Sequence, residues 1–532
     1  MKRWNGWGDE AQVFPLPANA LPFLASRAGA ARPPRDAALA DVLLTVPESR
    51  IKAAGTGAFD TSAENRLRHG RGQSYADWVL LRTGSPGPFV DAVALPATHE
   101  EAADALERAR ELGATVIPYG GGTSVVGHLT VPGSDRPVVS ISLERMNRLL
   151  SLDAESMVAR FGAGTAGPDV EAQLAPSGLL LGHFPQSYDY STVGGWVVTR
   201  SSGQQSLRYG RIEQLFHAGR LATFKGDFAV GGLPASSAGQ DLRECVMGSE
   251  GRLGLLTEVS VRVRPIPEHE AFHAVFFPSW DAGMAAIRTL AQGDAGLSLA
   301  RLSNEVETET QLALAGHASL IRWLERYLKM RGIGAGKVML LLGASGGTRA
   351  VKRVLGDALS LCRAYRGVHA GRRPGAAWVR NRFRSAYLRN SLWDVGYAVD
   401  TMETCLEWPR VTPYMRAVEQ AARDSFAAEQ VRVHAYTHLS HVYRQGCSVY
   451  STFVWPAAGD RERDLALWTR FKKAVSETIV KFRGTISHQH GVGADHAPYL
   501  AAEKGAVGMD LMRAIAREFD PDGLLNPGKL LP

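Results

Sequence analysis

Cysteine is scarce in this chain, and long apolar runs are absent. Only four of the 532 residues are cysteine, and no two of them form a CxxC pair. This usage argues against a disulfide framework or a zinc site and is typical of reduced thiols in a cytosolic protein. No apolar run follows a basic start, and no stretch of about 18 uncharged apolar residues occurs. We therefore expect neither a secretion signal nor a transmembrane span.

A strong excess of charge of one sign is also missing. The 60 lysines and arginines oppose 53 aspartates and glutamates, which gives a net charge of +7. Arginines cluster at Arg372–Arg373 and Arg380–Arg389, but no basic run carries interleaved aromatic residues. We predict no nucleic-acid partner. The basic excess fits an anionic small ligand or an anionic membrane surface, and a merely solvated basic surface fits it equally well.

The common phosphate-binding motifs are missing too, although residues 116–129 ("VIPYGGGTSVVGHL") are rich in glycine. A Walker A loop requires a lysine and a hydroxyl where His128 and Leu129 stand, and the dinucleotide fingerprint requires a glycine where Val125 stands. Glycine nevertheless lets the backbone approach a ligand closely, and successive N–H groups can cradle a pyrophosphate. For this stretch alone, a pyrophosphate cradle and a plain tight turn are equally good interpretations.

Two further loops in the same half combine glycine with serine and threonine. They are residues 188–210 ("YDYSTVGGWVVTRSSGQQSLRYG") and 248–258 ("GSEGRLGLLTE"). Either loop alone is explained as turns. Three such loops in one half of the chain favour one large, planar, phosphate-bearing ligand over three unrelated turns.

The order of elements predicts an α+β protein of several domains, since 532 residues exceed what one core usually holds. A strand at 91–96, a helix capped by Thr98 and a strand at 114–120 form a βαβ-like opening. Period-two alternation in 254–268 ends in proline-rich residues that mark a boundary. The predicted units are an N-terminal arm (1–85), a ligand-binding domain (86–268), a second domain (269–500) and a C-terminal segment that packs back on the ligand-binding domain (501–532).

The sequence of the second half predicts further strands and helices. Residues 431–455 indicate two strands joined at Arg444–Cys447, and a helix follows at about 460–482. Residues 319–330 predict an amphipathic helix with Trp323 on its apolar face. Packing on the core is the default interpretation of that face. Contact with a bilayer surface is the alternative, because tryptophan and basic residues are typical of interfacial helices.

Three histidines in this half resemble a metal site only if the segment is helical. His434, His438 and His441 lie among β-branched residues, which favour a strand. In a strand, His434 and His438 would be about 13 Å apart and His441 would point to the opposite face. We therefore predict no metal site.

The segments "PYGGGTSV", "STVGGWVVTRSSG" and "GSEGRLGLLTEVSVRVRP" resemble the flavin-binding loops of the vanillyl-alcohol oxidase/p-cresol methylhydroxylase flavoproteins. The segments "RWNGWG", "HFPQSYDYSTVGGW", "YLRNSLWDVGYAVDTMET" and "SHQHGVG" resemble the alkyldihydroxyacetonephosphate synthase branch of this family. The resemblance runs over nearly the whole chain. It implies a two-subdomain FAD-binding domain of the p-cresol methylhydroxylase type, a cap domain over the flavin ring, and FAD held without a covalent bond.

The resemblance also implies which residues contact FAD. They are Pro118, Gly120, Gly121, Gly122, Thr123 and Ser124 in the first loop; Gln186, Ser187, Asp189, Ser191, Thr192, Gly194, Gly195, Thr199, Arg200, Ser201 and Ser202 in the second; and Glu250, Gly251, Leu253 and Gly254 in the third.

The chemistry implied by the branch is an exchange without net redox change. A fatty alcohol replaces the acyl group of acyl-dihydroxyacetone phosphate through an adduct at flavin N5, as in ether lipid synthesis. Tyr450 matches the family's proton-abstracting tyrosine, whose pKa near 10 would have to be lowered for it to act as a base. Arg301 and Arg389 match arginines that bind phosphate or carboxylate groups, and His183 matches a histidine beside the flavin-binding strand.

His488 and His490 complete the implied catalytic set. They flank Gln489, where the family more often has a third histidine. A glutamine can donate a hydrogen bond but cannot shuttle a proton, so a role that depends on the middle histidine is in doubt.

Two other functions stay open. One is an FAD-dependent oxidase or dehydrogenase of a 2-hydroxy acid or alcohol, and the other is a non-catalytic lipid- or flavin-binding protein. The implied partners are a lipid-like phosphate substrate and a fatty alcohol. The family further implies a homodimer, and we expect a cytoplasmic protein with peripheral membrane contact as the alternative to a fully soluble one.

Overall fold

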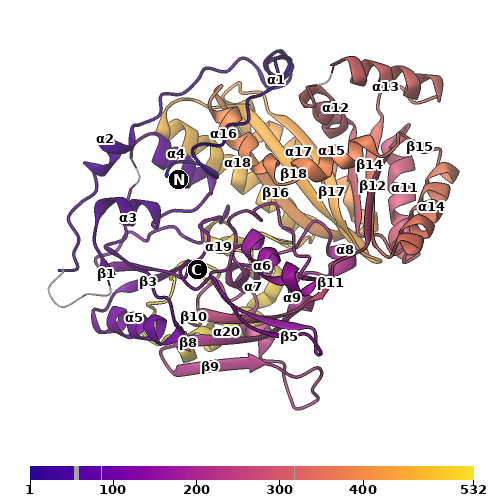
Figure 1. Cartoon of the computed structure of the whole chain (residues 1–532). Helices are drawn as coiled ribbons and strands as arrows, with labels where there is room; N and C mark the ends of the chain where they lie inside the picture. Colours follow the sequence, from indigo (N-terminus) through magenta and orange to yellow (C-terminus); the bar gives the residue numbers. More distant parts are fainter. Residues whose placement is uncertain (53–58, 86, 317) are drawn as a thin grey trace.

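The computed structural model describes residues 1–52, 59–85, 87–316 and 318–532. Within these ranges the chain forms sheets of four, five, two and seven strands, together with helices. Figure 1 shows the first half of the chain below and to the left of a sheet-and-helix layer that the second half forms. The architecture belongs to the predicted α+β class.

The N-terminal segment runs along both halves of the molecule. It contains α1 (Ala20–Ala28), α2 (Leu39–Leu43), α3 (Ala63–Arg68), α4 (Tyr75–Arg82) and the short strand β1 (Phe59–Asp60). Trp7 exchanges two backbone-to-side-chain hydrogen bonds with Asn390 of the second half. Helix α4 packs on α18 (Arg461–Lys481). The segment therefore contacts the second half at both Trp7 and α4.

A four-stranded sheet opens the first half, in the order β1-β2-β4-β3. Strands β2 (Ala92–Ala94), β3 (Thr115–Tyr119) and β4 (Val138–Ser142) are parallel, and β1 pairs with β2 in the antiparallel sense. Helix α5 (His99–Glu111) starts where predicted, because the Thr98 side chain accepts a hydrogen bond from the Glu101 N–H. The helix ends at Glu111, and Gly113, just beyond this end, has a φ of +60°.

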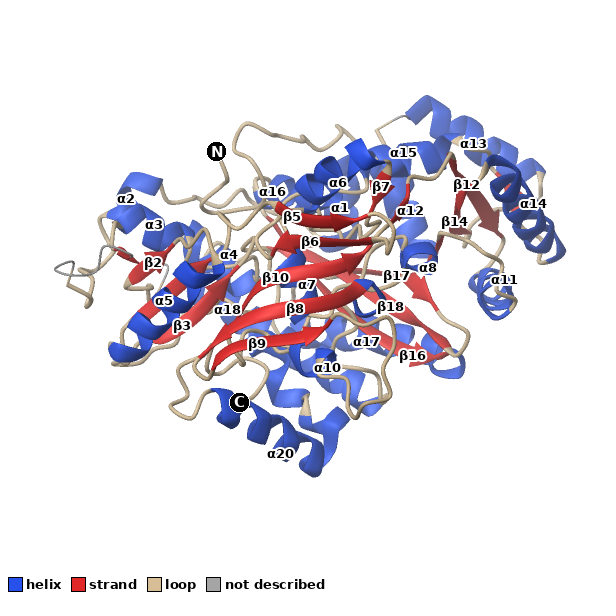
Figure 2. Ribbon diagram, turned by 60° about the horizontal axis from the view of Figure 1, so that its bottom comes forward, coloured by secondary structure: helices blue, strands red, loops and turns tan. Residues whose placement is uncertain are grey.

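A five-stranded antiparallel sheet follows, with β5 (Leu149–Asp153), β6 (Val158–Gly162), β10 (Leu255–Arg262), β8 (Phe216–Thr223) and β9 (Gly226–Gly231) in that order. Figure 2 shows these strands side by side. Helix α5 contacts strands of both sheets, so one apolar cluster joins the two subdomains. The remaining elements are α6 (Gly167–Leu174), α7 (Val193–Val198), α8 (Ser206–Tyr209), α9 (Ile212–Leu215), α10 (Arg243–Val246) and the strand pair β7 (Leu179–Leu180) with β11 (Arg264–Pro265).

The second half is built on a seven-stranded antiparallel sheet. Its order is β15 (Val368–His369), β12 (His269–Phe277), β14 (Val338–Gly346), β13 (Leu299–Ser303), β17 (His434–Val442), β18 (Gly446–Pro456) and β16 (Tyr397–Glu407). Strands β17 and β18 join where the sequence predicts, around Arg444. In this pairing Glu403 lies directly opposite Tyr450, and Tyr450 opposite His438.

Helices cover the two faces of this sheet unequally. On one face α11 (Trp280–Gln292), α14 (Thr348–Ala364), α17 (Trp408–Ala427) and α18 share the largest apolar core with the strands. On the other face a smaller cluster joins β12, β13 and β14 to α13 (Ala318–Met330) and α15 (Arg373–Asn381). The rest of that face, along β13, β17, β18 and β16, turns toward the first half, between α12 (Glu305–Leu314) and α16 (Leu388–Trp393).

The C-terminal segment returns to the first half. After α19 (Gly493–His496) and α20 (Ala501–Phe519), the chain pairs with β3: the Asn526 N–H donates to the Val116 carbonyl, and the Val116 N–H donates to the Leu524 carbonyl, both at 2.8 Å. Lys529 Nζ donates to the Thr130 carbonyl at 2.6 Å. The tail thereby closes against the glycine-rich segment that follows β3.

Helix α13 divides its apolar face between the core and the surface. Leu328 is buried, and Leu324 and Tyr327 pack on the smaller cluster. Leu320 and Trp323 are 45% and 64% exposed, so core packing accounts for one edge of the helix only. Among the residues that the structure describes, no helix has both the length and the apolar character needed to cross a membrane.

Candidate active site

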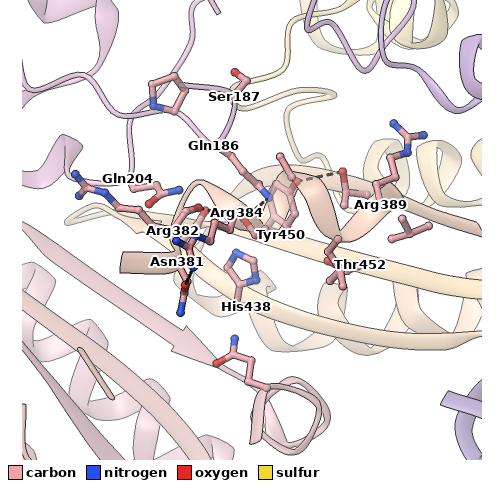
Figure 3. Close-up of a pocket in the computed structure, with 18 of the residues that line it drawn as sticks. Gln186, Ser187, Gln204, Asn381, Arg382, Arg384, Arg389, His438, Tyr450 and Thr452 are labelled. Carbon is pink, nitrogen blue, oxygen red and sulfur yellow. Dashed lines mark hydrogen bonds between the residues drawn. The ribbon is translucent and has the colours of Figure 1, made fainter. Parts of the chain in front are cut away.

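A cavity of about 690 Å³ lies between the loops of the first half and the uncovered face of the seven-stranded sheet. The sheet contributes Arg301, His438, Tyr450 and Thr452, and the predicted cofactor loops contribute Thr123, Gln186, Ser187, Ser201 and Ser202. Apolar residues of the arm and helices, among them Phe14, Leu16, Leu314 and Leu392, line the cavity as well. Figure 3 shows His438 and Tyr450 on neighbouring strands, with Arg389 to one side and Arg382 to the other.

A second cavity, of about 490 Å³, adjoins the first. It is lined by Thr199, Arg200, Glu250 and Leu253 of the predicted cofactor set and by His488. Gln489 lines both cavities. The other predicted cofactor residues line neither cavity and lie in β3, in α7 and in the loops beside them: Pro118, Gly120, Gly121, Gly122, Ser124, Asp189, Ser191, Thr192, Gly194, Gly195, Gly251 and Gly254.

The first two glycine loops pack directly on each other. A Cβ atom at Gly121 would lie 1.8 Å from the Tyr190 carbonyl oxygen, and one at Gly120 would lie 2.7 Å from Thr192 Oγ1. Gly122 has a φ of +69°, which disfavours any other residue. The loop that follows β3 therefore has no side chains at these three positions, so its backbone is uncovered, as a phosphate cradle requires.

The third loop fixes the segment that follows the His488–His490 loop. The buried Glu250 carboxylate accepts hydrogen bonds from the N–H groups of Val492 and Gly493, at 2.5 and 2.8 Å. Its Oε2 also lies 3.0 Å from His128 Nε2. Glu250 therefore acts in this structure as an anchor between the two halves, in addition to lining the second cavity.

Tyr450 lies at the centre of the large cavity wall on β18. Its hydroxyl donates to Thr401 Oγ1 at 3.2 Å. Burial raises the pKa of Tyr450 well above its usual value of 10, because the phenolate would lose its hydration. The surrounding protein groups therefore keep Tyr450 protonated. They do not lower its pKa, as a role as a base would require.

Arg301 and His438 share one buried carboxylate that sequence reasoning missed. Glu307, at the start of α12, lies 2.6 Å from Arg301 Nη2 and 3.0 Å from His438 Nδ1. Burial works to raise the pKa of Glu307, but Arg301 and then His438 lower it to about 2. Glu307 is therefore ionised at neutral pH. It opposes the charge of Arg301, which the sequence predicts to face a substrate anion.

Arg389 lies on the other side of Tyr450. Its guanidinium stacks on the Trp78 ring with 4.5 Å between the Cζ atom and the ring centroid, and Nη1 donates to the Gln73 carbonyl. Its buried Nη2 has no hydrogen-bond partner among the described residues. Of the two predicted arginines, Arg389 is the one that presents an unused donor beside the cavity.

A second missed carboxylate holds the His488–His490 loop. Glu403 on β16 accepts hydrogen bonds from the N–H groups of His488, Gln489 and His490 at 2.8 to 3.1 Å and from Ser487 Oγ at 2.8 Å. Glu403 lies within the segment "YLRNSLWDVGYAVDTMET" that resembles the synthase branch, but sequence reasoning assigned it no role. The role of Glu403 is evident only in the structure, where the His488–His490 loop folds back onto β16.

The two histidines of this loop lie on different cavities. The His490 ring meets the Tyr450 ring edge-on with 5.7 Å between centroids and lines the large cavity. His488 Nε2 lies 2.6 Å from Arg211 Nη1 and 2.7 Å from the Tyr443 hydroxyl, beside the second cavity. Burial lowers the pKa of both imidazoles, so both are neutral at pH 7.

His183 is buried behind the cavity wall rather than on it. Its ring packs on Trp196, and its Nε2 lies 3.2 Å from Ser201 Oγ. Burial lowers the pKa of His183 to about 3. His183 supports the second cofactor loop in this structure and has no direct access to the large cavity.

The three histidines of β17 have three different partners. His434 Nε2 lies 2.9 Å from Thr310 Oγ1, His438 contacts Glu307, and His441 Nε2 donates to the Gly203 carbonyl at 2.9 Å. The strand assignment is correct. Sequence reasoning considered His438 only for the rejected metal site; the pairing of β17 with β18 places it directly opposite Tyr450.

Comparisons with known proteins place this geometry in a family. Residues 90–231 match the family described as FAD binding domain, and residues 266–530 match FAD linked oxidases, C-terminal domain. The alkyldihydroxyacetonephosphate synthase of Caenorhabditis elegans is 30% identical over 503 residues, which cover 92% of this chain and 83% of that protein. A solved structure of an alkyldihydroxyacetonephosphate synthase superposes with a TM-score of 0.85 at 23% identity, over 99% of this chain and 97% of that one. The structure of p-cresol methylhydroxylase does so with a TM-score of 0.68 at 13% identity, over 93% and 98%.

These matches confirm the predicted fold and FAD as the cofactor. The residues present fit such a group. The bare glycine backbone can receive phosphate oxygens, and the buried polar atoms Ser202 Oγ, Arg389 Nη2 and Gln489 Oε1 lack partners among the described residues and belong to side chains that line the large cavity. The loops that would hold FAD and the sheet that would face its ring therefore meet at one cavity.

Proposed function

Because the chain belongs to the alkyldihydroxyacetonephosphate synthase family, we propose that it exchanges the acyl group of acyl-dihydroxyacetone phosphate for a fatty alcohol, without net oxidation or reduction. The observation that carries this proposal is the lining of the large cavity. Arginine, histidine and tyrosine on the sheet adjoin an apolar wall from the arm, α12 and α16. This combination suits a substrate with a phosphate head and a long alkyl chain.

The roles of the chain's residues follow from their positions. FAD, held without a covalent bond by the glycine loops, would supply an electron sink for the reacting carbon. The unused donor of Arg389 would bind the phosphate by charge-assisted hydrogen bonds. Tyr450 would face the reacting carbon, and His490 lies against the Tyr450 ring. The apolar wall would hold the alkyl chains and exclude water.

The test is a mass balance under anaerobic conditions. Purified FAD-loaded protein receives acyl-dihydroxyacetone phosphate and hexadecanol with no electron acceptor, and ether product and free fatty acid are quantified. We expect the two in equal amounts, with bleaching of the flavin by the first substrate that the alcohol reverses. Lasting bleaching by a 2-hydroxy acid, reversed only by an electron acceptor, would instead identify a dehydrogenase.

We also propose that α13 touches a membrane surface, which gives a lipid substrate a route to the cavity. The supports are the exposed Leu320 and Trp323 and the position of Leu314, which lines the cavity at the end of α12 just before α13. In liposome sedimentation we expect Trp323→Glu to release protein to the supernatant. Leu511→Glu is the matched control, because Leu511 is 61% exposed on α20; equal release by both variants, or by neither, contradicts the proposal.

A cytoplasmic location and a homodimer belong to the same proposal. The first is checked by cell fractionation with and without high salt, and the second by analytical ultracentrifugation of the FAD-loaded protein. If the protein is a monomer at all concentrations, the proposed dimer is wrong, whereas the proposed exchange reaction is unaffected.

A further inference from the structure

His438 is held in one tautomer by a buried carboxylate. Its Nδ1 lies 3.0 Å from Glu307 Oε1, and both side chains are nearly inaccessible to solvent. Because the Glu307 carboxylate is ionised, Nδ1 must be the nitrogen that carries the proton. Helix α12 fixes the carboxylate in turn, since the Glu307 N–H donates to the capping side chain of Asn304.

The other ring nitrogen of His438 is left with a lone pair. His438 lines the large cavity, and Nε2 makes no hydrogen bond to any residue that the structure describes. The ring stacks on Tyr450 with 4.9 Å between centroids and 21° between planes, which keeps its orientation. An oriented imidazole with a free lone pair and a carboxylate behind it is the arrangement of a general base.

The neighbouring phenol has the opposite character. Burial raises the pKa of Tyr450 and lowers the pKa of His438. At neutral pH Tyr450 is therefore a proton donor, already bonded to Thr401, whereas His438 is neutral and able to accept a proton. Two groups side by side with opposite protonation states can handle two different protons of one reaction.

We propose that His438 is the general base for the incoming fatty alcohol and that Glu307 is its positioning residue; this inference rests on the proposed exchange reaction. The alcohol O–H bond breaks and its proton moves to His438 Nε2 while the alcohol oxygen forms its bond to C1 of the dihydroxyacetone phosphate. The acyl carboxylate leaves with the electron pair of its bond to C1. His438 then returns the proton to solvent, so the exchange is balanced and redox-neutral.

The alcohol, rather than the C1 proton, is assigned to His438 because of what surrounds it. His438 lies where α12 meets the sheet, and the cavity wall there continues through Thr310, Gln311 and Leu314 toward the apolar end. An alkyl chain in that end would bring its hydroxyl back toward the sheet. Tyr450 stacks on the His438 ring, and His490 meets Tyr450 edge-on. Figure 3 shows Tyr450 between His438 and Arg389.

Two partial reactions separate these roles. In deuterium oxide, exchange of the C1 hydrogen of acyl-dihydroxyacetone phosphate without alcohol reports the first proton transfer, and ether formation with hexadecanol reports the second. We expect His438→Gln to retain C1 exchange within about twofold and to lose ether formation by about 100-fold. His434→Gln is the matched control, a buried histidine on the same strand that contacts Thr310 and does not line the cavity.

Ether formation that survives His438→Gln, or C1 exchange that falls with it to the same degree, overturns the assignment. FAD content and melting temperature of each variant show whether it is folded. If wild type shows neither partial reaction, the exchange function fails; the Glu307–His438 pair is then still judged by ¹⁵N NMR of labelled histidines. We expect His438 to be protonated at Nδ1 and bare at Nε2 in wild type, and the opposite tautomer would refute the pair.

The pH profile tests Glu307. The groups that face His438 are Arg301 on β13, Glu307 on α12, Tyr450 on β18 and, on its own strand, Tyr436 and His441. Glu307 favours the charged imidazole and Arg301 opposes it. In Glu307→Gln, we expect the acidic limb of ether formation to move to lower pH and the maximal rate to fall about tenfold, with C1 exchange unchanged. An unmoved limb would assign Glu307 a structural role only.

Discussion

The first half backs the cavity with glycine loops in which backbone packs on backbone, here called the first wall. The sheet lines the cavity with charged side chains from separate elements that pack on one another, here called the second wall. Gly121 touches the Tyr190 carbonyl with no room for one carbon atom. Arg301, Glu307 and His438 come from a strand, a helix and another strand and share one carboxylate. The first wall is therefore sensitive to volume and the second to charge, and substitutions of each kind should have different signatures.

The largest effect is expected from volume on the first wall. Gly121→Ala would force the loop away from Tyr190, because the added Cβ would lie 1.8 Å from its carbonyl oxygen. We expect FAD affinity to fall by about 100-fold, since overpacking costs up to about 3 kcal/mol and displaces the cradle itself. Flavin absorbance after purification measures this. Gly133→Ala, which meets no atom within 4 Å, should remain yellow, and loss of FAD from it would contradict the argument.

On the sheet wall, removal of one hydroxyl should abolish turnover without loss of the cofactor. Tyr450→Phe keeps the ring against His438 and His490 but removes the proton donor beside the cavity. We expect exchange activity to fall by about 100-fold or more with FAD content unchanged. Tyr414→Phe is the control, because Tyr414 is buried on α17 behind the sheet. A passive binding protein would respond to neither substitution.

Glu403 combines the two kinds of packing, because its charged carboxylate holds a backbone loop in place. In Glu403→Gln the amide group would face three backbone N–H donors that now point at a carboxylate. We expect a loss of about 2–3 kcal/mol of stability and about tenfold in activity. Urea unfolding and kinetics measure the two. Glu419→Gln, on the helix-covered face beside Thr437, should lower stability without a comparable loss of activity; if activity falls equally, Glu403 has no special link to the loop.

The smallest effect concerns Asp495, buried behind the same loop. Burial raises its pKa to about 6 from an ordinary value of 3.8. The folded state thus binds this proton more tightly than the unfolded state, so the contribution of Asp495 to stability falls between pH 4 and 6 and is flat above. We expect Asp495→Asn to stabilise the protein by about 1–3 kcal/mol at pH 7 and to flatten this slope. Asp135→Asn, at an exposed position, should change neither; a slope that persists in Asp495→Asn points to another group.

Local patterns were enough to predict many elements of the fold. Thr98 caps α5, the strands of 431–455 join near Arg444, and the helix predicted at 460–482 spans Arg461–Lys481. Each of these depends on neighbours in the chain: a cap, a turn or a period. The exposure of Trp323 could not be read in the same way, because an apolar helix face does not say which part of it meets the core.

By itself, the sequence determined the glycine loops, the FAD-binding family and the candidates Tyr450, Arg389 and His490 that meet at the cavity. Only the tertiary structure decided that His183 lies behind the wall, that Arg301 is opposed by Glu307, and that Glu403 holds the loop of His488 and His490. The physical reason is that glycine acts through its own backbone conformation, which is local. A carboxylate acts through whatever donors the fold brings within about 3 Å of it, and those lie far away in the chain.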